Sequence, residues 1–361
     1  MKLIICGDMS VTDQSWQFFA QEDADGAFHD VQASFRSADK VIVNLECAVT
    51  DHAQGITKIG PCLKAPANTV KTLKKAGVTH CTLSNNHIFD FGRKGLADTL
   101  AALEESGIPY TGIGENYEDS RKDMILKGEG FTVAIVNVCE HEYSYATENR
   151  MGARPFDEFE TMEDIRRAKE QNRFVVVIYH GGKELCRYPS PRLRKACREM
   201  VRCGADVVLC QHSHIIGCCE DFEGGHILYG QGNFHFVGRM DTESWNEGLM
   251  AELTFDQSGV AVRYIPVVAE NGGIALQKPE AAQKTLAEMA TRNEELADGR
   301  WKEQWHQFCL SAFHVYDDSR KGVAKTEEGK IQRFAHYLDC EAHRDVWMEL
   351  FPTWNHTNEL T

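Results

Sequence analysis

Five short stretches of this chain combine carboxylates, amides and imidazoles, the side chains that bind divalent metal ions and transfer protons. One of them, SNNHIFDFG, places Asn86, His87 and Asp90 within five residues and ends on a glycine. Such a cluster alone is most often a polar turn, and a lone histidine is most often a hydrogen-bonded core residue. The other four are LIICGD, VIVNLE, FVVVIYHGG and DVVLCQHSH, which contain Asp8, Asn44, Glu46, His180, His212 and His214.

Short apolar runs precede these polar residues and have the length of buried strands. The predicted strands cover residues 3–6, 41–43, 80–83, 131–138, 174–179 and 206–210. Amphipathic spacing predicts helices between them, for example over residues 94–106, 158–171 and 191–203. This alternation predicts an α/β fold with a layered sheet. In open α/β sheets ligands bind beyond the carboxyl ends of the strands, which is where all five polar stretches fall.

The donor set indicates a particular kind of metal site. Oxygen and imidazole donors without thiolate suit Mn²⁺, Fe²⁺ or Zn²⁺. Six or seven donors are too many for one tetrahedral zinc ion with an open position, whereas two ions that share a carboxylate would use them all. Two such ions polarise a substrate oxygen and lower the pKa of bound water. The expected cofactors are therefore two divalent metal ions, and the expected chemistry is hydrolysis or a related polar reaction.

Composition excludes several classes of protein and partner. The 361 residues carry a net charge of -15 without a basic stripe, which argues against nucleic acid. Thirteen cysteines without zinc-ligand spacing favour reduced, buried thiols. The sequence begins directly with a strand, and no window is long and apolar enough to span a bilayer. We therefore expect a cytoplasmic protein with no membrane insertion.

The domain organisation predicted from the pattern is an α/β domain over residues 1–270 followed by a helical extension over residues 271–361. From about Gln277 the composition changes to Ala, Glu, Lys, Gln and Trp with helical spacing. The extension could cover the site or form a homodimer. The sequence does not decide between these two roles.

The order and spacing of six motifs resemble the CapA family, also called the poly-γ-glutamate capsule synthesis (PGA_cap) family. The motifs are GD near the start, NLE, NNHIFDFG, HGGKE with YPSP after it, GADVVLCQHSH and ILYGQGNFHF. That family is similar in fold to the calcineurin-like metallophosphoesterases. The resemblance covers about residues 1–240 and implies a metallophosphoesterase-like layered sandwich with its metal site at the carboxyl ends of the strands.

The resemblance also implies roles for individual residues. By analogy with metallophosphoesterases, Asp8 and His214 would hold one metal, Glu46 would bridge, and a second set would hold the other metal: Asn86, His180 and His212. His87 would donate a proton or stabilise developing charge, and Asp90 would orient it.

Three departures from the family pattern affect these roles. Ser10 stands where metallophosphoesterases usually carry a histidine, which weakens the expectation for the first metal. Asn44 in NLE competes with Glu46 as a ligand, and Glu46 is preferred because a carboxylate bridges two cations well. The family commonly has HWGxEY where this chain has HGGKEL, so Gly182 and Leu185 remove aromatic surface and a different substrate wall is expected.

Three charged residues are candidates for substrate binding. Lys183 would bind a carboxylate or phosphate, and Glu184 would act as a base or near the metals, although the two are as easily explained as a surface pair. Arg154 is a candidate anion clamp because its guanidinium matches carboxylates and phosphates, although a lone arginine is more often structural.

Three functions remain open from the sequence. The first is a dinuclear metal hydrolase acting on a phosphoester or an amide or γ-glutamyl-type substrate linked to capsule or polyglutamate metabolism. The second is a metal-dependent enzyme that does not hydrolyse, such as an epimerase or transferase of peptides or polyglutamate. The third is a non-catalytic capsule-assembly protein, against which the intact His87 counts. The expected substrate is a small molecule, a peptide or polyglutamate.

Overall fold

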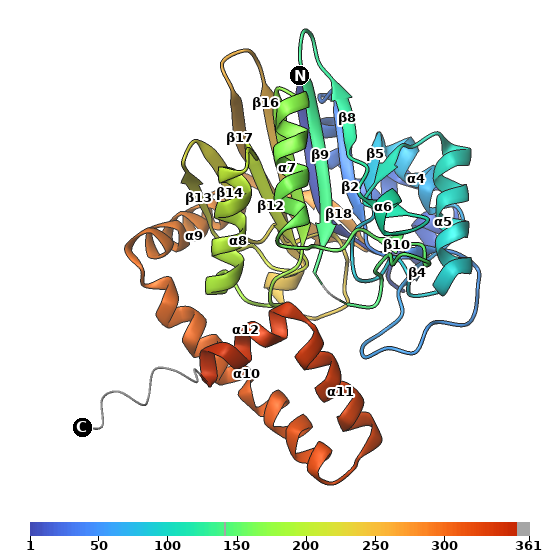
Figure 1. Ribbon diagram of the computed structural model, residues 1–361. Coiled ribbons are helices and arrows are strands. Elements are labelled where there is room, and N and C mark those ends of the chain that lie inside the picture. Colours follow the sequence, from blue (N-terminus) through green and yellow to red (C-terminus); the bar gives the residue numbers. More distant parts are fainter. Residues whose placement is uncertain (141, 352–361) are drawn as a thin grey trace.

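The computed structural model describes residues 1–140 and 142–351, and it contains two large β-sheets packed face to face (Figure 1). The first sheet has the strand order β18-β17-β16-β1-β2-β5-β6, with β15 paired to β1. Strands β1, β2, β5, β6 and β15 run parallel, whereas β16 to β18 are antiparallel additions at one side. Their bounds are β1 (Lys2–Met9), β2 (Lys40–Leu45), β5 (His80–Thr82), β6 (Tyr110–Thr111), β15 (Asn233–His235), β16 (Glu247–Phe255), β17 (Val260–Glu270) and β18 (Gly273–Leu276).

The second sheet has the order β13-β14-β12-β11-β9-β8. Its central strands β9, β11, β12 and β14 are parallel, and β8 and β13 close its two edges in antiparallel fashion. The bounds are β8 (Met124–Lys127), β9 (Thr132–Cys139), β11 (Phe174–His180), β12 (Val207–Gln211), β13 (Cys219–Phe222) and β14 (Gly225–Leu228). Two short pairs lie outside the sheets: β3 (Ala48–Val49) with β4 (Lys64–Ala65), and β7 (Ile113–Gly114) with β10 (Gly152–Ala153).

Both faces of each sheet are buried, which explains the nearly continuous apolar strands in the sequence. The layer between the sheets contains branched residues from both, among them Ile5, Ile42, Val176 and Leu209. Helices α1 to α5 cover the outer face of the first sheet, and α7 and α8 cover that of the second. These helices are α1 (Trp16–Ala20), α2 (Ala24–Phe28), α3 (Val31–Arg36), α4 (Thr69–Ala76), α5 (Gly92–Ser106), α7 (Glu160–Gln171) and α8 (Pro191–Arg202); α6 (Tyr117–Ser120) and a 3-10 turn (Glu243–Trp245) lie in connections.

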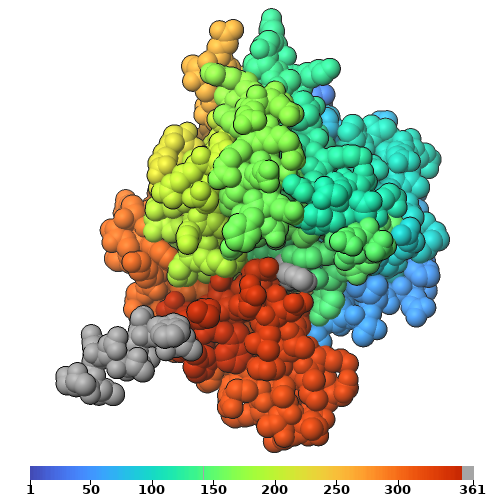
Figure 2. All heavy atoms as spheres, viewed as in Figure 1, coloured from blue at the N-terminus to red at the C-terminus, as the bar shows by residue number. Residues whose placement is uncertain are grey.

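The C-terminal part of the described chain is helical, as expected, and consists of α9 (Pro279–Asp298), α10 (Trp301–Ala324), α11 (Glu328–Asp339) and α12 (Glu341–Leu350). Helix α9 packs along β13 and β17, whereas α10 to α12 lie beyond the end of the sandwich opposite the N-terminus (Figure 1). In the space-filling view this helical group is seated directly against that end (Figure 2). Trp301 and Trp305 join the same buried cluster as α8, so the group is anchored by apolar contact.

The predicted boundary between residues 270 and 271 falls inside the hairpin of β17 and β18. Asn271 and Gly272 both have positive φ, 50° and 81°, the conformation that Asn-Gly turns adopt between antiparallel strands. The helical segment therefore begins at Pro279, and residues 352–361 of the predicted extension lie outside the described residues.

The layered α/β sandwich expected from the sequence is confirmed. Each of the six predicted strands is present within two or three residues of its expected ends, as are the three predicted helices. Among the described residues, the structure has no helix long and apolar enough to cross a bilayer.

Candidate metal centre

The predicted ligands lie at one end of the sandwich because parallel strands of both sheets end there. Asp8 pairs with Asn44 across β1 and β2, and His180 pairs with Gln211 across β11 and β12. The facing sheets thus bring residues about two hundred positions apart in the sequence into contact. His212 illustrates this, because its backbone N–H donates to Asp8 Oδ2 at 2.8 Å.

Asp8 is fully buried and is held by neighbouring polar groups. Asn44 Nδ2 donates to Asp8 Oδ1 at 2.8 Å and lies 3.2 Å from His180 Nδ1. The other end of that amide accepts a hydrogen bond from Asn85 Nδ2 at 3.0 Å. Both ends of the Asn44 side chain are therefore occupied, which suits a residue that orients Asp8. Asn44 thus has less freedom to act as the competing ligand than the sequence allowed.

Glu46 occupies the centre of the cluster. Its carboxylate is fully buried, and neither oxygen has a hydrogen-bond partner among the described residues. Oε1 lies 3.5 Å from His180 Nε2. Buried carboxylate oxygens without hydrogen bonds are costly, and a bound cation would satisfy both of them. The donor chemistry therefore fits a divalent metal ion.

Glu46 belongs to two groups of donors whose ligand atoms lie within 4.8 Å of one another. One group is Asp8, Glu46 and His180, and the other is Glu46, His212 and His214. These groups differ from the division expected by analogy, which paired Asp8 with His214 and His180 with His212. The shared position of Glu46 is the one a bridging ligand needs, while the assignment of each ligand to an ion stays a prediction.

Asn86 lies at the edge of the same cluster. Its Oδ1 is 3.0 Å from His180 Nε2, and its Nδ2 donates to Glu142 Oε2 at 3.0 Å. Glu142 Oε1 is also 3.8 Å from His212 Nε2. Glu142 is thus a further carboxylate at the site, and no motif in the sequence pointed to it.

The loop with His212 and His214 is held in an uncommon backbone conformation. Both residues have positive φ, 84° and 59°, which is sparsely populated for residues with side chains. Such strain, of the order of 1–3 kcal/mol per residue, is found chiefly at functional sites. Asn233 Oδ1 lies 2.9 Å from His214 Nδ1, and its Nδ2 donates to the His214 carbonyl, which together orient the imidazole. A donor bond from Nδ1 leaves Nε2 as the ligand atom.

The electrostatics of the cluster favour positive charge. Burial alone would lower the pKa of His180, but Glu46 and Asp8 outweigh it and raise the pKa to about 10. Despite desolvation, His180 and His214 in turn lower the pKa of Asp8 to about 2. At His212 the desolvation and the neighbouring His180 both lower the pKa. The negative field that stabilises a proton on His180 would also stabilise a metal cation.

His87 lies beside the candidate ligands, together with the residue expected to orient it. His87 Nδ1 is 2.6 Å from Asp90 Oδ2, and Asp90 also accepts from Leu63 N at 2.7 Å. A third residue, Lys58, donates to Asp90 Oδ1 at 2.6 Å and lies 3.3 Å from His87 Nδ1. Lys58 comes from a loop with no recognisable motif, so sequence reasoning missed it.

Of the three candidate substrate residues, two line a cavity beside the cluster and the third, Arg154, does not. Lys183 and Glu184 line a cavity of about 640 Å³ together with His87, His212 and His214. Lys183 is half-buried, whereas Glu184 is exposed.

Arg154 is a structural residue rather than an anion clamp. Its guanidinium is buried, with Nη1 donating to Asp123 at 2.8 Å and Nη2 donating to Asp164 at 2.7 Å. Both carboxylates already neutralise it, and it does not line the cavity beside the cluster. The predicted substrate role of Arg154 is therefore corrected: the residue fastens β10 to α7 and the start of β8.

The C-terminal helices complete the cavity, as expected if the extension covers the site. His336 and Tyr337 of α11, with Cys340 and His343 at the start of α12, line it opposite the cluster. No sequence signal could have found them, because they lie more than a hundred residues after His214 and outside every motif.

The layered α/β sandwich brings together, at the carboxyl ends of its strands, two buried groups of His, Asp and Glu that could hold metal ions. The chain belongs to the family described as "Bacterial capsule synthesis protein PGA_cap", whose model matches residues 2–237. The resemblance inferred from the six motifs is confirmed.

Named relatives carry related descriptions. "PGA biosynthesis protein CapA" of Bacillus subtilis is 28% identical over 293 residues, which cover 78% of this chain and 74% of that protein. "Capsule biosynthesis protein CapA" of Bacillus anthracis is 33% identical over 180 residues, which cover 48% of this chain and 44% of that protein. A "Probable polyglutamine synthesis accessory protein" of Mycobacterium tuberculosis is 26% identical and covers 55% of each chain.

Solved structures overlap this fold only partly. A protein described as a novel phosphatase from Mycoplasma pneumoniae matches with a TM-score of 0.47 and 15% identity, over 78% of this chain and 95% of that one. A hypothetical protein from Thermus thermophilus matches with a TM-score of 0.46 and 15% identity, over 77% of this chain and 100% of that one. TM-scores this low support no conclusion about function.

Proposed function

We propose that this protein is a dinuclear metal-dependent hydrolase that cleaves a phosphoester or a γ-glutamyl-type amide in the metabolism of capsule or polyglutamate. Mn²⁺, Fe²⁺ and Zn²⁺ all suit its nitrogen and oxygen donors. The name of one relative, "PGA biosynthesis protein CapA", supports the link to polyglutamate.

The observation that carries the proposal is the buried Glu46 carboxylate, which has no hydrogen-bond partner among the described residues and lies between two histidine groups. Asp8, His180, His212 and His214 would hold the ions together with it, and Asn86 lies within their reach. Bound divalent ions supply polarisation of a substrate oxygen and a lowered pKa for water at neutral pH.

The residues around the cluster have separate tasks in this proposal. Asp90 holds His87 through Nδ1, which leaves Nε2 to give a proton to the leaving group. Lys58 keeps the Asp90 carboxylate compensated and fixed. Lys183 lines the cavity without an ion pair among the described side chains, so it is available to bind an anionic group of the substrate.

The presence of His87 favours an enzyme over an assembly protein. A protein that only bound metal and polymer would not require an imidazole outside the ligand set, backed by a carboxylate and facing the cavity.

The experiment that tests the function combines metal analysis with two assays. Full-length protein is analysed for bound metals by mass spectrometry and incubated with Mn²⁺ and either a chromogenic phosphodiester or γ-linked glutamate oligomers. Cleavage that incorporates ¹⁸O from labelled water is expected. Metal-loaded protein that cleaves neither substrate but exchanges carbon-bound hydrogen of the oligomers with solvent deuterium would overturn hydrolysis in favour of epimerisation.

A matched pair of variants identifies the proton donor. His87→Gln is expected to lower kcat by roughly 10²–10³-fold at unchanged metal content, because general acid catalysis contributes of this order. His52→Gln, which changes an exposed histidine of a nearby loop, is expected to leave kcat unchanged. Equal activity of the two variants would remove His87 from the mechanism.

A further inference from the structure

Glu142 is a carboxylate at the candidate metal centre to which neither the motifs nor the proposed function gives a role. It lies three residues after the end of β9, and its side chain is 12% exposed. Among the described residues no lysine or arginine forms an ion pair with it, and its charged neighbour is the imidazole of His212. A carboxylate so nearly buried without a cationic partner is uncommon in proteins. Its place beside the cluster therefore calls for a local reason.

Glu142 determines which end of the Asn86 amide faces the cluster. An ionised carboxylate only accepts hydrogen bonds, so the atom of Asn86 that lies 3.0 Å from Glu142 Oε2 is its donor, Nδ2. The Oδ1 end of the same amide then faces the other way and lies 3.0 Å from His180 Nε2. Glu46 Oε1 is 3.5 Å from the same nitrogen of His180. The amide oxygen of Asn86 is thus held among the candidate metal donors.

The second oxygen of Glu142 lies close to His212. Oε1 is 3.8 Å from His212 Nε2, which is too far for a hydrogen bond but near enough for the negative charge to favour a proton on that nitrogen. The Nδ1 atom of the same ring is buried and has no hydrogen-bond partner among the described residues. A neutral imidazole binds a metal ion through the nitrogen that carries no proton. Glu142 therefore favours Nδ1 as the ligand atom of His212.

The chain next to Glu142 is held from two sides. The ring of Tyr143 stacks on His336 of α11, with 5.3 Å between the ring centroids. The Tyr143 hydroxyl accepts a hydrogen bond from Ile59 N at 3.0 Å. A loop of the α/β domain and a helix of the C-terminal extension thus fix the backbone that carries the carboxylate. A fixed carboxylate can orient the ligands that it contacts.

We propose that Glu142 is a positioning residue of the metal centre, which turns the oxygen of Asn86 and the Nδ1 atom of His212 toward one and the same ion. That ion is the one that the family resemblance assigns to Asn86, His180 and His212. The charge of Glu142 also adds to the charges of Asp8 and Glu46, so three carboxylates would face the two ions. This inference rests on the metal centre of the proposed function and not on hydrolysis.

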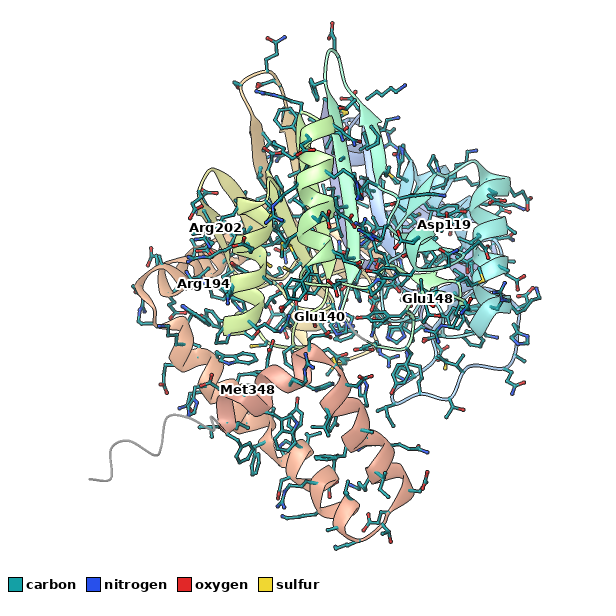
Figure 3. The ribbon with its side chains drawn as sticks, viewed as in Figure 1. Asp119, Glu140, Glu148, Arg194, Arg202 and Met348 are labelled. Atoms are coloured by element: carbon teal, nitrogen blue, oxygen red, sulfur yellow. The ribbon has the colours of Figure 1, made fainter. Side chains whose placement is uncertain are left out.

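Calorimetric titration of metal-free, full-length protein with Mn²⁺ tests this role without turnover. Glu142→Ala is expected to weaken one of the two Mn²⁺ sites by about 10–100-fold, because residues that orient metal ligands contribute of this order. Glu142→Gln is expected to lose less, because the glutamine oxygen can still accept from Asn86 Nδ2. The control is Glu148→Ala, which removes an exposed carboxylate from the same connection between β9 and β10 (Figure 3) and should keep both affinities.

A double-mutant cycle shows whether Glu142 acts through Asn86. In the background of Asn86→Ala, Glu142→Ala is expected to cost less Mn²⁺ affinity than in the wild type, because the amide that it orients is then missing. The absorption spectrum of bound Co²⁺ is a second readout, since loss of an oxygen ligand changes the coordination geometry of the ion. Glu142→Ala should alter this spectrum in the same direction as Asn86→Ala, whereas Glu148→Ala should keep the spectrum of the wild type.

Equal Mn²⁺ affinities of Glu142→Ala and the wild type would overturn the proposal, as would additive losses in the cycle. An equal loss in Glu142→Gln and Glu142→Ala would overturn it as well, because the carboxylate would then act by its charge or as a ligand itself. Weakened Mn²⁺ binding in a protein that cleaves no substrate would support the positioning role while contradicting hydrolysis, so the two failures are distinguishable. The metal-free variants are expected to melt at the temperature of the wild type, which excludes a folding defect.

Discussion

The ammonium group of Lys58 lies 2.6 Å from Asp90 Oδ1, and the two side chains are 2% and 0% exposed. This pair connects a loop without any motif to the carboxylate that orients His87. Removing one partner from a buried ion pair leaves the other charge without compensation.

Lys58→Met is therefore expected to lower the free energy of unfolding by about 3 kcal/mol in metal-free protein. Denaturant unfolding measures this directly. The double variant Lys58→Met, Asp90→Asn should lose less than the sum of the two single variants, because neither then leaves a buried charge behind. Additive losses would show that the pair is not coupled.

His212→Ala is expected to remove one metal ion per chain and all turnover, because the imidazole is a donor in the group around Glu46. Elemental analysis of purified protein checks the metal content, and His52→Ala controls for the loss of any histidine. His212→Gly, which adopts positive φ without strain, should lose the same ion. Full metal content in either His212 variant would contradict the ligand assignment.

Arg192→Met is expected to destabilise the protein by about 3–5 kcal/mol and to release α12, because Glu140 and Asp345 would remain buried without their cation. Limited proteolysis should then cleave the C-terminal helices first. The matched control is Arg202→Met on the same helix, whose guanidinium pairs with Glu199 and Glu223 at the exposed surface (Figure 3). A surface pair contributes only about 0–1 kcal/mol, so equal losses in the two variants would contradict the anchoring role.

The lowered pKa of Glu220 predicts that the protein loses stability in acid. Burial would raise the pKa of this carboxyl, but hydrogen bonds from Arg198 and Arg194 outweigh it and lower the pKa to about 2. Since the folded pKa lies below the ordinary value near 4.5, the contribution is fully present above that pH and is lost as the pH falls toward 2. Melting temperatures across this range should fall less steeply for Glu220→Gln than for the wild type. Parallel curves would contradict the prediction.

The sequence predicted the sandwich well because both sheets are buried on both faces, so their central strands are continuous apolar runs such as residues 174–179. It did not predict the short strands β3, β4, β7 and β10, whose two-residue lengths leave no periodic pattern. The hairpin before the helical extension was missed although Asn271-Gly272 carries a clear turn signal.

The candidate site was predictable where a polar residue follows a strand, as with Asp8 and His180. Lys58, Glu142 and His343 were not, because their place at the site depends on how a loop and two helices pack against the sheet ends. Arg154 shows the opposite error, since a guanidinium suited to an anionic ligand serves equally well to join two aspartates of the protein itself.

The position of the cavity's helical wall in the sequence has a consequence for how the protein is made. All candidate metal donors come from the first 214 residues, and the last strand of the sandwich ends at Leu276, whereas the helical residues that line the cavity lie between 336 and 343. A chain emerging from the ribosome therefore presents all of these candidate donors before the helices that line the cavity are made. Metal ions can reach the cluster at that stage before the helical wall of the cavity is in place.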